Sequence, residues 1–324
     1  MLLPSQTERE ALRRFNLLME TETIELHSPL AREAVQPAST LREKLSAYLE
    51  LTKPRITFLI VLTSAAGFCL GSAGAVDYAL LTHAMIGIAL LSSGIATINQ
   101  FMERDLDALM RRTEKRPLPT GRLLPLEALW FGLALTLTAE VYLASFVNLL
   151  TAALGLTIIA GYLLLYTPLK TRTTLSTVVG AFPGAMPPLI GWAAARGQVG
   201  IAAWVLFAIL FLWQFPHFLA IAWMYREDYG RAGIRMLPVV EPEGRVTGQQ
   251  IVAFTIMLIP VSLLPAVMGI SGRVYLVAAI VLGLLFLVSS VRAALSKSNQ
   301  HARQLLLASV LYLPLLFGVM VLNR

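Results

Sequence analysis

Residues 79–107 read ALLTHAMIGIALLSSGIATINQFMERDLD, and this stretch decides the class of fold. Its first part, 79–101, is mostly apolar and long enough for a helix to cross about 30 Å of hydrocarbon. Its end is polar, with Asn99, Glu103 and Asp107 recurring every four residues. Each step of four drifts only ~40° around a helix, so the three side chains share one face over two turns. The stretch therefore predicts a membrane-spanning helix that ends in a row of oxygen ligands.

The rest of the chain has the same apolar character. Of its 324 residues, 56% are hydrophobic and only 14% are charged, and its mean hydropathy is +0.69. A soluble domain usually carries roughly 25% charged residues. We therefore predict an all-α polytopic membrane protein, a bundle of nine transmembrane helices. The expected spans are 56–74, 79–101, 124–145, 148–167, 174–194, 199–219, 250–269, 274–292 and 304–322.

The positive charges are distributed very unevenly between the two predicted membrane faces. One face receives 23 of the 26 Lys and Arg residues, and the other receives only Arg196, Arg273 and Arg324. The positive-inside rule then predicts a cytoplasmic N-terminus, with residues 1–45 as a cytoplasmic tail and 46–324 as the membrane domain. The rule also explains the net charge of +7, so a nucleic-acid partner is not needed and membrane lipid is the expected surrounding.

The polar end of the stretch 79–107 is a candidate metal site. An amide oxygen and two carboxylates suit Mg²⁺, which prefers one or two carboxylates together with substrate phosphates. Arg112 and Arg116 follow closely and would neutralise phosphate oxygens. The alternative is a solvated acidic helix end balanced by its arginines. Asn99 favours a functional site because it lies inside the apolar run, where an unpartnered polar side chain is costly.

Other spans bring polar groups to the same predicted face. Lys53 and Arg55 precede the first span, and Tyr162, Tyr166 and Lys170 end the fourth. A simple anchoring belt of cations and tyrosines is the alternative explanation for these residues.

The ends of spans 2 and 6 resemble each other weakly. The sixth span ends near His217 and is followed by an Arg-acid cluster that contains Asp228. Both loops then continue with Arg-x-Leu-Pro, at 116–119 and 235–238. Two related halves that meet at one site would give such a pattern.

Glycines and prolines predict two features of the helix packing. The run 180–188, GAFPGAMPP, predicts a bent fifth span whose freed carbonyl groups need partners. Gly67 and Gly71 form a small-xxx-small pair that favours close contact between helices. The single cysteine, Cys69, excludes an intrachain disulfide and a cysteine-based metal cluster.

Taken together, these motifs resemble the UbiA-type intramembrane prenyltransferases. The row Asn99, Glu103 and Asp107 is similar to the first acidic motif of that family, Asn-x-x-x-Asp-x-x-x-Asp. The segments 52–55 (TKPR), 112–118 (RTEKRPL), 166–170 (YTPLK) and 213–218 (WQFPHF) are similar to the branch of protoheme IX farnesyltransferases, or heme O synthases. The resemblance runs from about residue 51 to the end of the chain.

The chain departs from the family pattern at two places. The middle acid is Glu103 where the family usually has Asp, so its carboxylate reaches one methylene further. The second acidic motif, Asp-x-x-x-Asp in the quinone-type relatives, is replaced by Tyr225-x-x-x-Tyr229, with Glu227 and Asp228 nearby. The second acidic motif is therefore absent in its usual form, and its loss agrees with the heme-modifying branch.

The resemblance implies a Mg²⁺-dependent reaction between farnesyl diphosphate and heme B that gives heme O and diphosphate. It implies that Asn99, Glu103 and Asp107 hold Mg²⁺, with Asp228 as a second-site ligand. The cations implied at the diphosphate are Lys53, Arg55, Arg112, Arg116 and Lys170. Tyr162 and Tyr166 are implied to face the allylic cation. It also implies a bacterial inner membrane, an active site on its cytoplasmic face, and a downstream heme A synthase as partner.

Three questions stay open at this stage. His217 has two interpretations. It ligates the heme iron or assists proton transfer, or else it is an ordinary buried, hydrogen-bonded histidine without a role in the reaction. A prenyltransferase that acts on another acceptor, a quinone precursor or a chlorin, is the second alternative, and the Tyr225/Tyr229 pattern and the Pro216-His217 pair argue against it. A transporter with an acidic inner vestibule is the alternative from another class, although transport predicts polar groups at mid-membrane and spans 7 to 9 are almost purely apolar.

Overall fold

The computed structural model describes residues 40–324. Most of the predicted cytoplasmic tail, 1–39, lies outside the described residues. Within 40–324 nine helical segments are long and apolar enough to span a membrane, which confirms the predicted number, and there is no β-strand. The spanning segments are α3 (Pro54–Gly71), α4 (Tyr78–Ala108), α5 (Pro125–Phe146), α6 with η2 and α7 (Leu149–Ile159, Ala160–Tyr166, Thr167–Leu169), α8 with α9 (Ser176–Gly184, Met186–Arg196), α10 (Ile201–Met224), α13 (Arg245–Val267), α14 (Arg273–Ser296) and α15 (Asn299–Leu322). The short helices are α2 (Leu41–Leu51), α11 (Arg226–Arg231) and α12 (Leu237–Val240).

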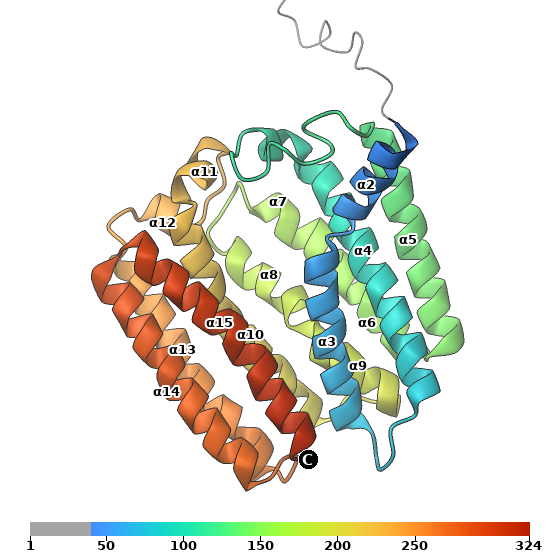
Figure 1. Cartoon of the computed structure of the whole chain (residues 1–324), viewed down its shortest axis with the longest axis vertical. Helices are drawn as coiled ribbons and strands as arrows, with labels where there is room; N and C mark the ends of the chain where they lie inside the picture. The colour runs from blue at the N-terminus through green and yellow to red at the C-terminus, as the bar shows by residue number, and fades with distance from the viewer. Residues whose placement is uncertain (1–39) are drawn as a thin grey trace, which may run out of the picture. The chain divides into compact units, whose positions relative to one another are not determined.

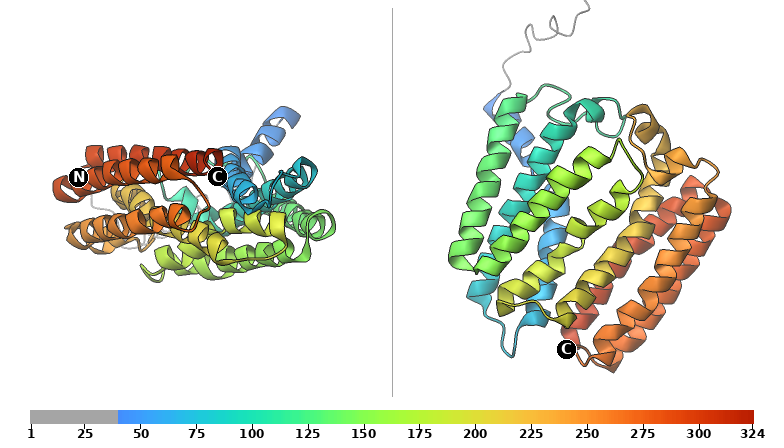
Figure 2. Two further views of the ribbon diagram at one scale, coloured as in Figure 1. Left: turned by 90° about the horizontal axis from the view of Figure 1, so that it is seen from below. Right: turned by 180° about the vertical axis from the view of Figure 1, so that it is seen from behind.

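Residues 46–324 form one compact unit, in which the last spanning helix, α15, contacts the first, α3. Helix α4 packs on α5, α3 on α9, and α10 on α13 and α15, while α15 also contacts α3 (Figures 1 and 2). Large apolar side chains cover the outside of the unit: Leu137, Leu285 and Leu311 are 68%, 61% and 63% exposed. An apolar exterior of this kind needs lipid around it, so the chain is an integral membrane protein.

Helices α3 and α9 approach closely because glycines leave room, as the sequence predicts. A methyl group at Gly67 would lie 2.1 Å from the carbonyl oxygen of Pro188, and one at Gly71 would lie 3.1 Å from the Cα of Trp192. Gly191 on α9 faces the carbonyl oxygen of Ser64 in the same way, at 1.9 Å. A methyl group at Gly67 or Gly191 would collide with backbone atoms, and one at Gly71 would require Trp192 to shift, so these glycines fix α3 beside the central helix α9.

Two irregular segments lie in the middle of the bundle. The predicted bend in the fifth span is confirmed, since α8 ends at Gly184 and α9 begins at Met186. The fourth span contains a π-helical turn, η2, which the sequence does not predict. It runs directly into Pro168, which lacks the backbone N–H that a regular helix would use. A π-helical turn often marks a functional site.

The longest connections lie at one end of the unit. We call this the charged end and define it by residues 109–124, 170–175 and 225–244. In Figure 1 it is the end that carries α7, α11 and α12, and residue 324 lies at the opposite end. The opposite end carries Arg196, Arg273 and Arg324, so the structure separates the cations between the ends as the sequence predicts.

Candidate functional site

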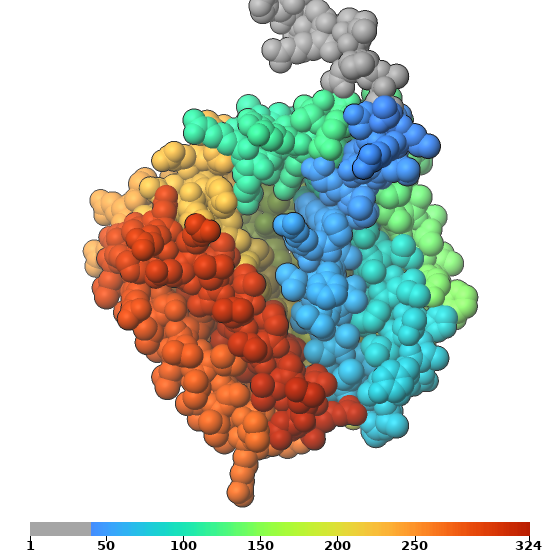
Figure 3. All heavy atoms as spheres, in the orientation of Figure 1, coloured from blue at the N-terminus to red at the C-terminus, as the bar shows by residue number. Residues whose placement is uncertain are grey.

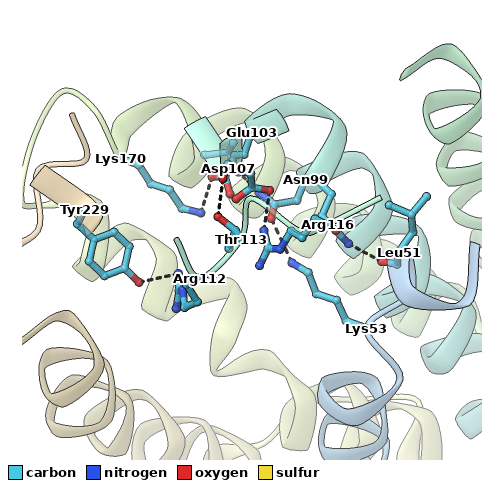
Figure 4. A network of polar contacts seen from close by, with 12 residues as sticks. Leu51, Lys53, Asn99, Glu103, Asp107, Arg112, Thr113, Arg116, Lys170 and Tyr229 are labelled. Atoms are coloured by element: carbon cyan, nitrogen blue, oxygen red, sulfur yellow. Dashed lines mark hydrogen bonds and ion pairs between the residues drawn. The ribbon is translucent and has the colours of Figure 1, made fainter. Parts of the chain in front are cut away.

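Three side chains of α4 line up at the charged end, as their spacing predicts. Asn99, Glu103 and Asp107 are all buried, with 2%, 8% and 1% of their surface exposed. Each carboxylate has a cation beside it: Lys170 Nζ lies 2.5 Å from Glu103 Oε1, and Arg116 Nη1 lies 2.6 Å from Asp107 Oδ2 (Figure 4). Buried carboxylates require such partners, because an isolated ion would be strongly destabilised.

Asn99 links α4 to two other segments. Lys53 Nζ, at the start of α3, donates to Asn99 Oδ1 at 3.5 Å, and Asn99 Nδ2 donates to Thr167 Oγ1 at 3.2 Å. Burial and the nearby Arg116 guanidinium lower the pKa of Lys53 to about 8. The Lys53 backbone is left-handed, with φ of 48°, and α3 begins directly after it at Pro54. This turn aims Lys53 at α4.

Sequence reasoning missed the hydroxyl groups that support this row. Thr167 accepts from Asn99 and itself donates to the carbonyl oxygen of Tyr162 at 2.9 Å. Thr113 donates to the carbonyl oxygen of Asp107 at 2.8 Å and is 1% exposed. The sequence signal for both threonines is that they lie within the motifs RTEKRPL and YTPLK.

Lys170 joins the row of acids to two tyrosines. Its Nζ lies 4.4 Å from the centre of the Tyr166 ring, and the rings of Tyr162 and Tyr166 meet edge to face at 5.1 Å. Burial alone would lower the pKa of Lys170, but the adjacent Tyr166 and Glu103 side chains outweigh it and raise this pKa. Lys170 is therefore a permanent cation.

The loop after α10 reaches the loop after α4 through Arg112. The Arg112 backbone N–H donates to Asp228 Oδ2 at 3.3 Å, and its Nη2 donates to the Tyr229 hydroxyl at 3.1 Å. The guanidinium lies 5.1 and 5.2 Å from the ring centres of Tyr225 and Tyr229. Asp228 also pairs with Arg231. The two loops that resemble each other in sequence are thus in contact.

Two predicted residues stand apart from this cluster. Arg55 is exposed and makes no hydrogen bond or ion pair with any other described residue. His217 lies on α10 and is bonded through Nδ1 to Ser309 Oγ of α15, at 2.7 Å. The structure brings together the other predicted residues: Lys53, Asn99, Glu103, Asp107, Arg112, Arg116, Tyr162, Tyr166, Lys170 and Asp228.

The cluster suits a polyanion together with a divalent cation. It contains three acids (Glu103, Asp107, Asp228) and five cations (Lys53, Arg112, Arg116, Lys170, Arg231), so two positive charges remain uncompensated. Within residues 40–324 no group of three or more His, Cys, Asp or Glu side chains could by itself hold a metal ion. The donors present, one amide oxygen and two carboxylates on one helix face, fit a Mg²⁺ ion completed by phosphate oxygens.

The chain is similar to known proteins over most of its length. The model of the UbiA prenyltransferase family matches residues 60–315. The chain is 55% identical to a protoheme IX farnesyltransferase of Solibacter usitatus (strain Ellin6076), over 86% of this chain and 98% of that protein. It is 48% identical to a protoheme IX farnesyltransferase of Koribacter versatilis (strain Ellin345), over 91% and 97%.

Solved structures share the fold at low sequence identity. A digeranylgeranylglyceryl phosphate synthase superposes with a TM-score of 0.73 at 17% identity, over 87% of this chain and 98% of that chain. A UbiA homolog from Archaeoglobus fulgidus bound to DMAPP and Mg²⁺ gives a TM-score of 0.58 at 17% identity, over 84% and 98%. By its family match, its relatives and its fold, the chain belongs to the UbiA prenyltransferase family.

Proposed function

We propose that this chain transfers the farnesyl group of farnesyl diphosphate to a vinyl group of heme B (protoheme IX), giving heme O. The observation that carries the proposal is the buried row Asn99, Glu103 and Asp107 surrounded by cations from three other segments. Relatives 48% and 55% identical over nearly their whole length, which are protoheme IX farnesyltransferases, support the choice of donor and acceptor.

The diphosphate is bound at the charged end in this proposal. Asn99, Glu103 and Asp107 would hold Mg²⁺, with Asp228 as a further candidate ligand, and a bound Mg²⁺ would neutralise phosphate oxygens as a Lewis acid. Lys53, Arg112, Arg116 and Lys170 would contact the remaining phosphate oxygens. Because Lys170 and Arg116 are already paired with Glu103 and Asp107, diphosphate binding requires these cations to exchange partners.

The reaction then divides into bond breaking and capture. The C–O bond of farnesyl diphosphate breaks, and diphosphate leaves with the electron pair, stabilised by the four cations. The vinyl group of heme B donates its π electrons to the allylic carbon and forms the new C–C bond. Water adds to the cation left on the heme side chain and loses a proton, which gives the hydroxyl group of heme O. Helices around the site would exclude water until that last step.

Aromatic side chains are assigned to the isoprenoid and the heme. The paired rings of Tyr162 and Tyr166 would face the allylic cation, since a ring face attracts positive charge. His217 is assigned to the heme, as an iron ligand or in proton transfer. Figure 3 shows the surface hollowed between α3 and α15, and α15 carries the Ser309 partner of His217.

The location of the site follows from the charge distribution. We propose that the charged end faces the cytoplasm of a bacterium across its inner membrane, because its three connections carry ten Lys and Arg residues, whereas the opposite end of the described chain carries three, Arg196, Arg273 and Arg324. The heme O product would pass to a heme A synthase.

The test is expression of the chain in a bacterial membrane, followed by extraction of hemes for chromatography and mass spectrometry. Glu103→Ala is the variant, and Asp105→Ala is its matched control, because Asp105 lies two residues away with an 85% exposed side chain. Farnesyl-hydroxyethyl heme is expected with the parent and Asp105→Ala but not with Glu103→Ala. A folded parent that yields no new heme despite ample farnesyl diphosphate would overturn the proposal and favour another acceptor.

A further inference from the structure

His217 is held in place by α15. Its Nδ1 lies 2.7 Å from Ser309 Oγ. Trp213, one turn earlier on α10, stacks on the imidazole at 4.7 Å and 23°, and donates from Nε1 to the Ser309 carbonyl oxygen at 2.9 Å. Ser309 is fully buried. Both the position and the tilt of the imidazole ring are therefore fixed by contacts that involve one residue of α15.

The hydrogen bonds of Ser309 determine which ring nitrogen of His217 carries the proton. A serine hydroxyl has a single hydrogen. Ser309 Oγ donates it to the Leu306 carbonyl oxygen at 2.6 Å, a separation that two oxygens reach only with a hydrogen between them. Toward His217, Ser309 can then only accept. This arrangement favours the neutral ring in which Nδ1 is protonated and Nε2 carries the lone pair.

The Nε2 atom of His217 is available to a ligand. It makes no hydrogen bond within residues 40–324, yet it is not among the buried side-chain atoms that lack a partner, so it retains accessible surface. His217 lies seven residues before the end of α10, and Glu103 lies five residues before the end of α4. At about 1.5 Å per residue, each residue therefore lies within about two turns of the point where its helix meets the charged end.

We propose that Ser309 is a positioning residue that selects the Nδ1–H form of His217, so that Nε2 presents its lone pair to the iron of heme B. The inference rests on the proposed function, since it takes heme as the acceptor. A metal-bound imidazole is oriented by the hydrogen bond at its other nitrogen, and removing such a partner typically weakens metal binding by about 10-fold or more. The simpler alternative is that Ser309 only ties α15 to α10.

The first experiment measures the proton position without heme. The chain has four histidines. Labelling the full chain in lipid with ¹⁵N-histidine therefore gives few signals in solid-state NMR, and the His217→Ala variant identifies the signals of His217. We expect Nδ1–H in the parent, and loss of that preference in Ser309→Ala. Ser290→Ala is the matched control, because Ser290 is also fully buried and bonds Thr255 at 2.9 Å on other helices. An Nε2–H ring in the parent, or no change in Ser309→Ala, would overturn the proposal.

The second experiment titrates the same proteins with heme B and records the optical and resonance Raman signature of an imidazole-bound iron. We expect this signature in the parent and in Ser290→Ala, about 10-fold weaker heme binding in Ser309→Ala, and recovery in Ser309→Thr, which keeps the hydroxyl. In a His217→Ala background, Ser309→Ala should have no further effect. Equal heme binding by the parent and Ser309→Ala would overturn the role of Ser309 while leaving the proposed function standing. A parent with the Nδ1–H ring that binds no heme would overturn both.

Discussion

The loops that follow α4 and α10 look alike in sequence but are built differently. In each region a buried aspartate pairs with an arginine that follows it in sequence, Asp107 at the end of α4 with Arg116 and Asp228 with Arg231. Asp107 belongs to a row of three oxygen donors along α4, whereas Asp228 is the only buried acid of its loop within the described chain. The first loop thus offers a set of ligands, and the second offers a single carboxylate.

The second loop instead surrounds an arginine of the first. Tyr225 and Tyr229 face the Arg112 guanidinium, and Asp228 accepts from the Arg112 backbone N–H. In the quinone-type pattern both tyrosine positions are aspartates. In this chain the second loop contacts Arg112 through both tyrosines and Asp228, and the predictions below test how the two loops divide the binding of Mg²⁺ and of diphosphate.

The largest effect is expected at Asp107. Asp107→Asn keeps the shape of the side chain, removes a proposed metal ligand and leaves Arg116 without its carboxylate partner. We expect kcat/KM for farnesyl diphosphate to fall roughly 100-fold or more, and the Mg²⁺ concentration for half-maximal activity to rise. Purified protein assayed over a Mg²⁺ series measures both, with Asp105→Asn as control. A variant as active as the parent would remove the first loop from metal binding.

The corresponding change in the second loop is expected to be milder. Asp228→Asn weakens the anchor of Arg112 but keeps the tyrosine rings, so we expect about a 10-fold lower kcat/KM. The Mg²⁺ dependence should change less than in Asp107→Asn, because the row on α4 is intact. If the half-maximal Mg²⁺ concentration rises as much as in Asp107→Asn, then Asp228 is a metal ligand and the two loops share one role.

A smaller effect is expected from the hydroxyl group that holds the Arg112 side chain. Tyr229→Phe removes the 3.1 Å hydrogen bond and keeps the ring at 5.2 Å. One hydrogen bond of about 1 kcal/mol corresponds to a fall of about fivefold in kcat/KM. Tyr48→Phe is a suitable control, because Tyr48 meets Phe131 edge to face at the same end and its hydroxyl makes no hydrogen bond with a described residue. An unchanged rate in Tyr229→Phe would mean that the rings alone position Arg112.

The features that could be predicted from the sequence depend on local patterns. The nine spans follow from apolar length, the shared face of Asn99, Glu103 and Asp107 from helical periodicity, and the break between α8 and α9 from glycine and proline. The π-helical turn of η2 has no distinctive composition, so neither its presence nor its bond from the Thr167 N–H to the Tyr162 carbonyl could be predicted.

The features that could not be predicted depend on contacts between distant segments. The Lys170–Glu103 pair joins residues 67 apart, and the Arg112–Asp228 contact joins residues 116 apart. Residues that are close in sequence can also point to different sides of the chain. Lys53 donates to Asn99, whereas Arg55 is exposed, because α3 starts between them and turns Arg55 to another side. A count of cations near the membrane surface therefore predicts the charge of the site but not which residues form it.

The smallest predicted effect is a pH dependence from Lys53. Its pKa is lowered to about 8, so in the free protein Lys53 is a cation at pH 7 and mostly neutral at pH 9. With three other cations still present, we expect kcat/KM for farnesyl diphosphate to fall only about threefold over this range. The parameter kcat/KM reports the free enzyme, so it should respond more than kcat. Lys53→Arg keeps its charge and should flatten the profile.

Stability should move in the opposite direction over the same range. Between pH 8 and the ordinary lysine pKa of about 10.4, the unfolded chain binds the proton that folded Lys53 has lost, so unfolding becomes less favourable as pH rises. The opposite trends separate Lys53 from a general loss of structure at alkaline pH. A parent that loses kcat/KM and thermal stability together above pH 8, with Lys53→Arg behaving identically, would show that another group controls the profile.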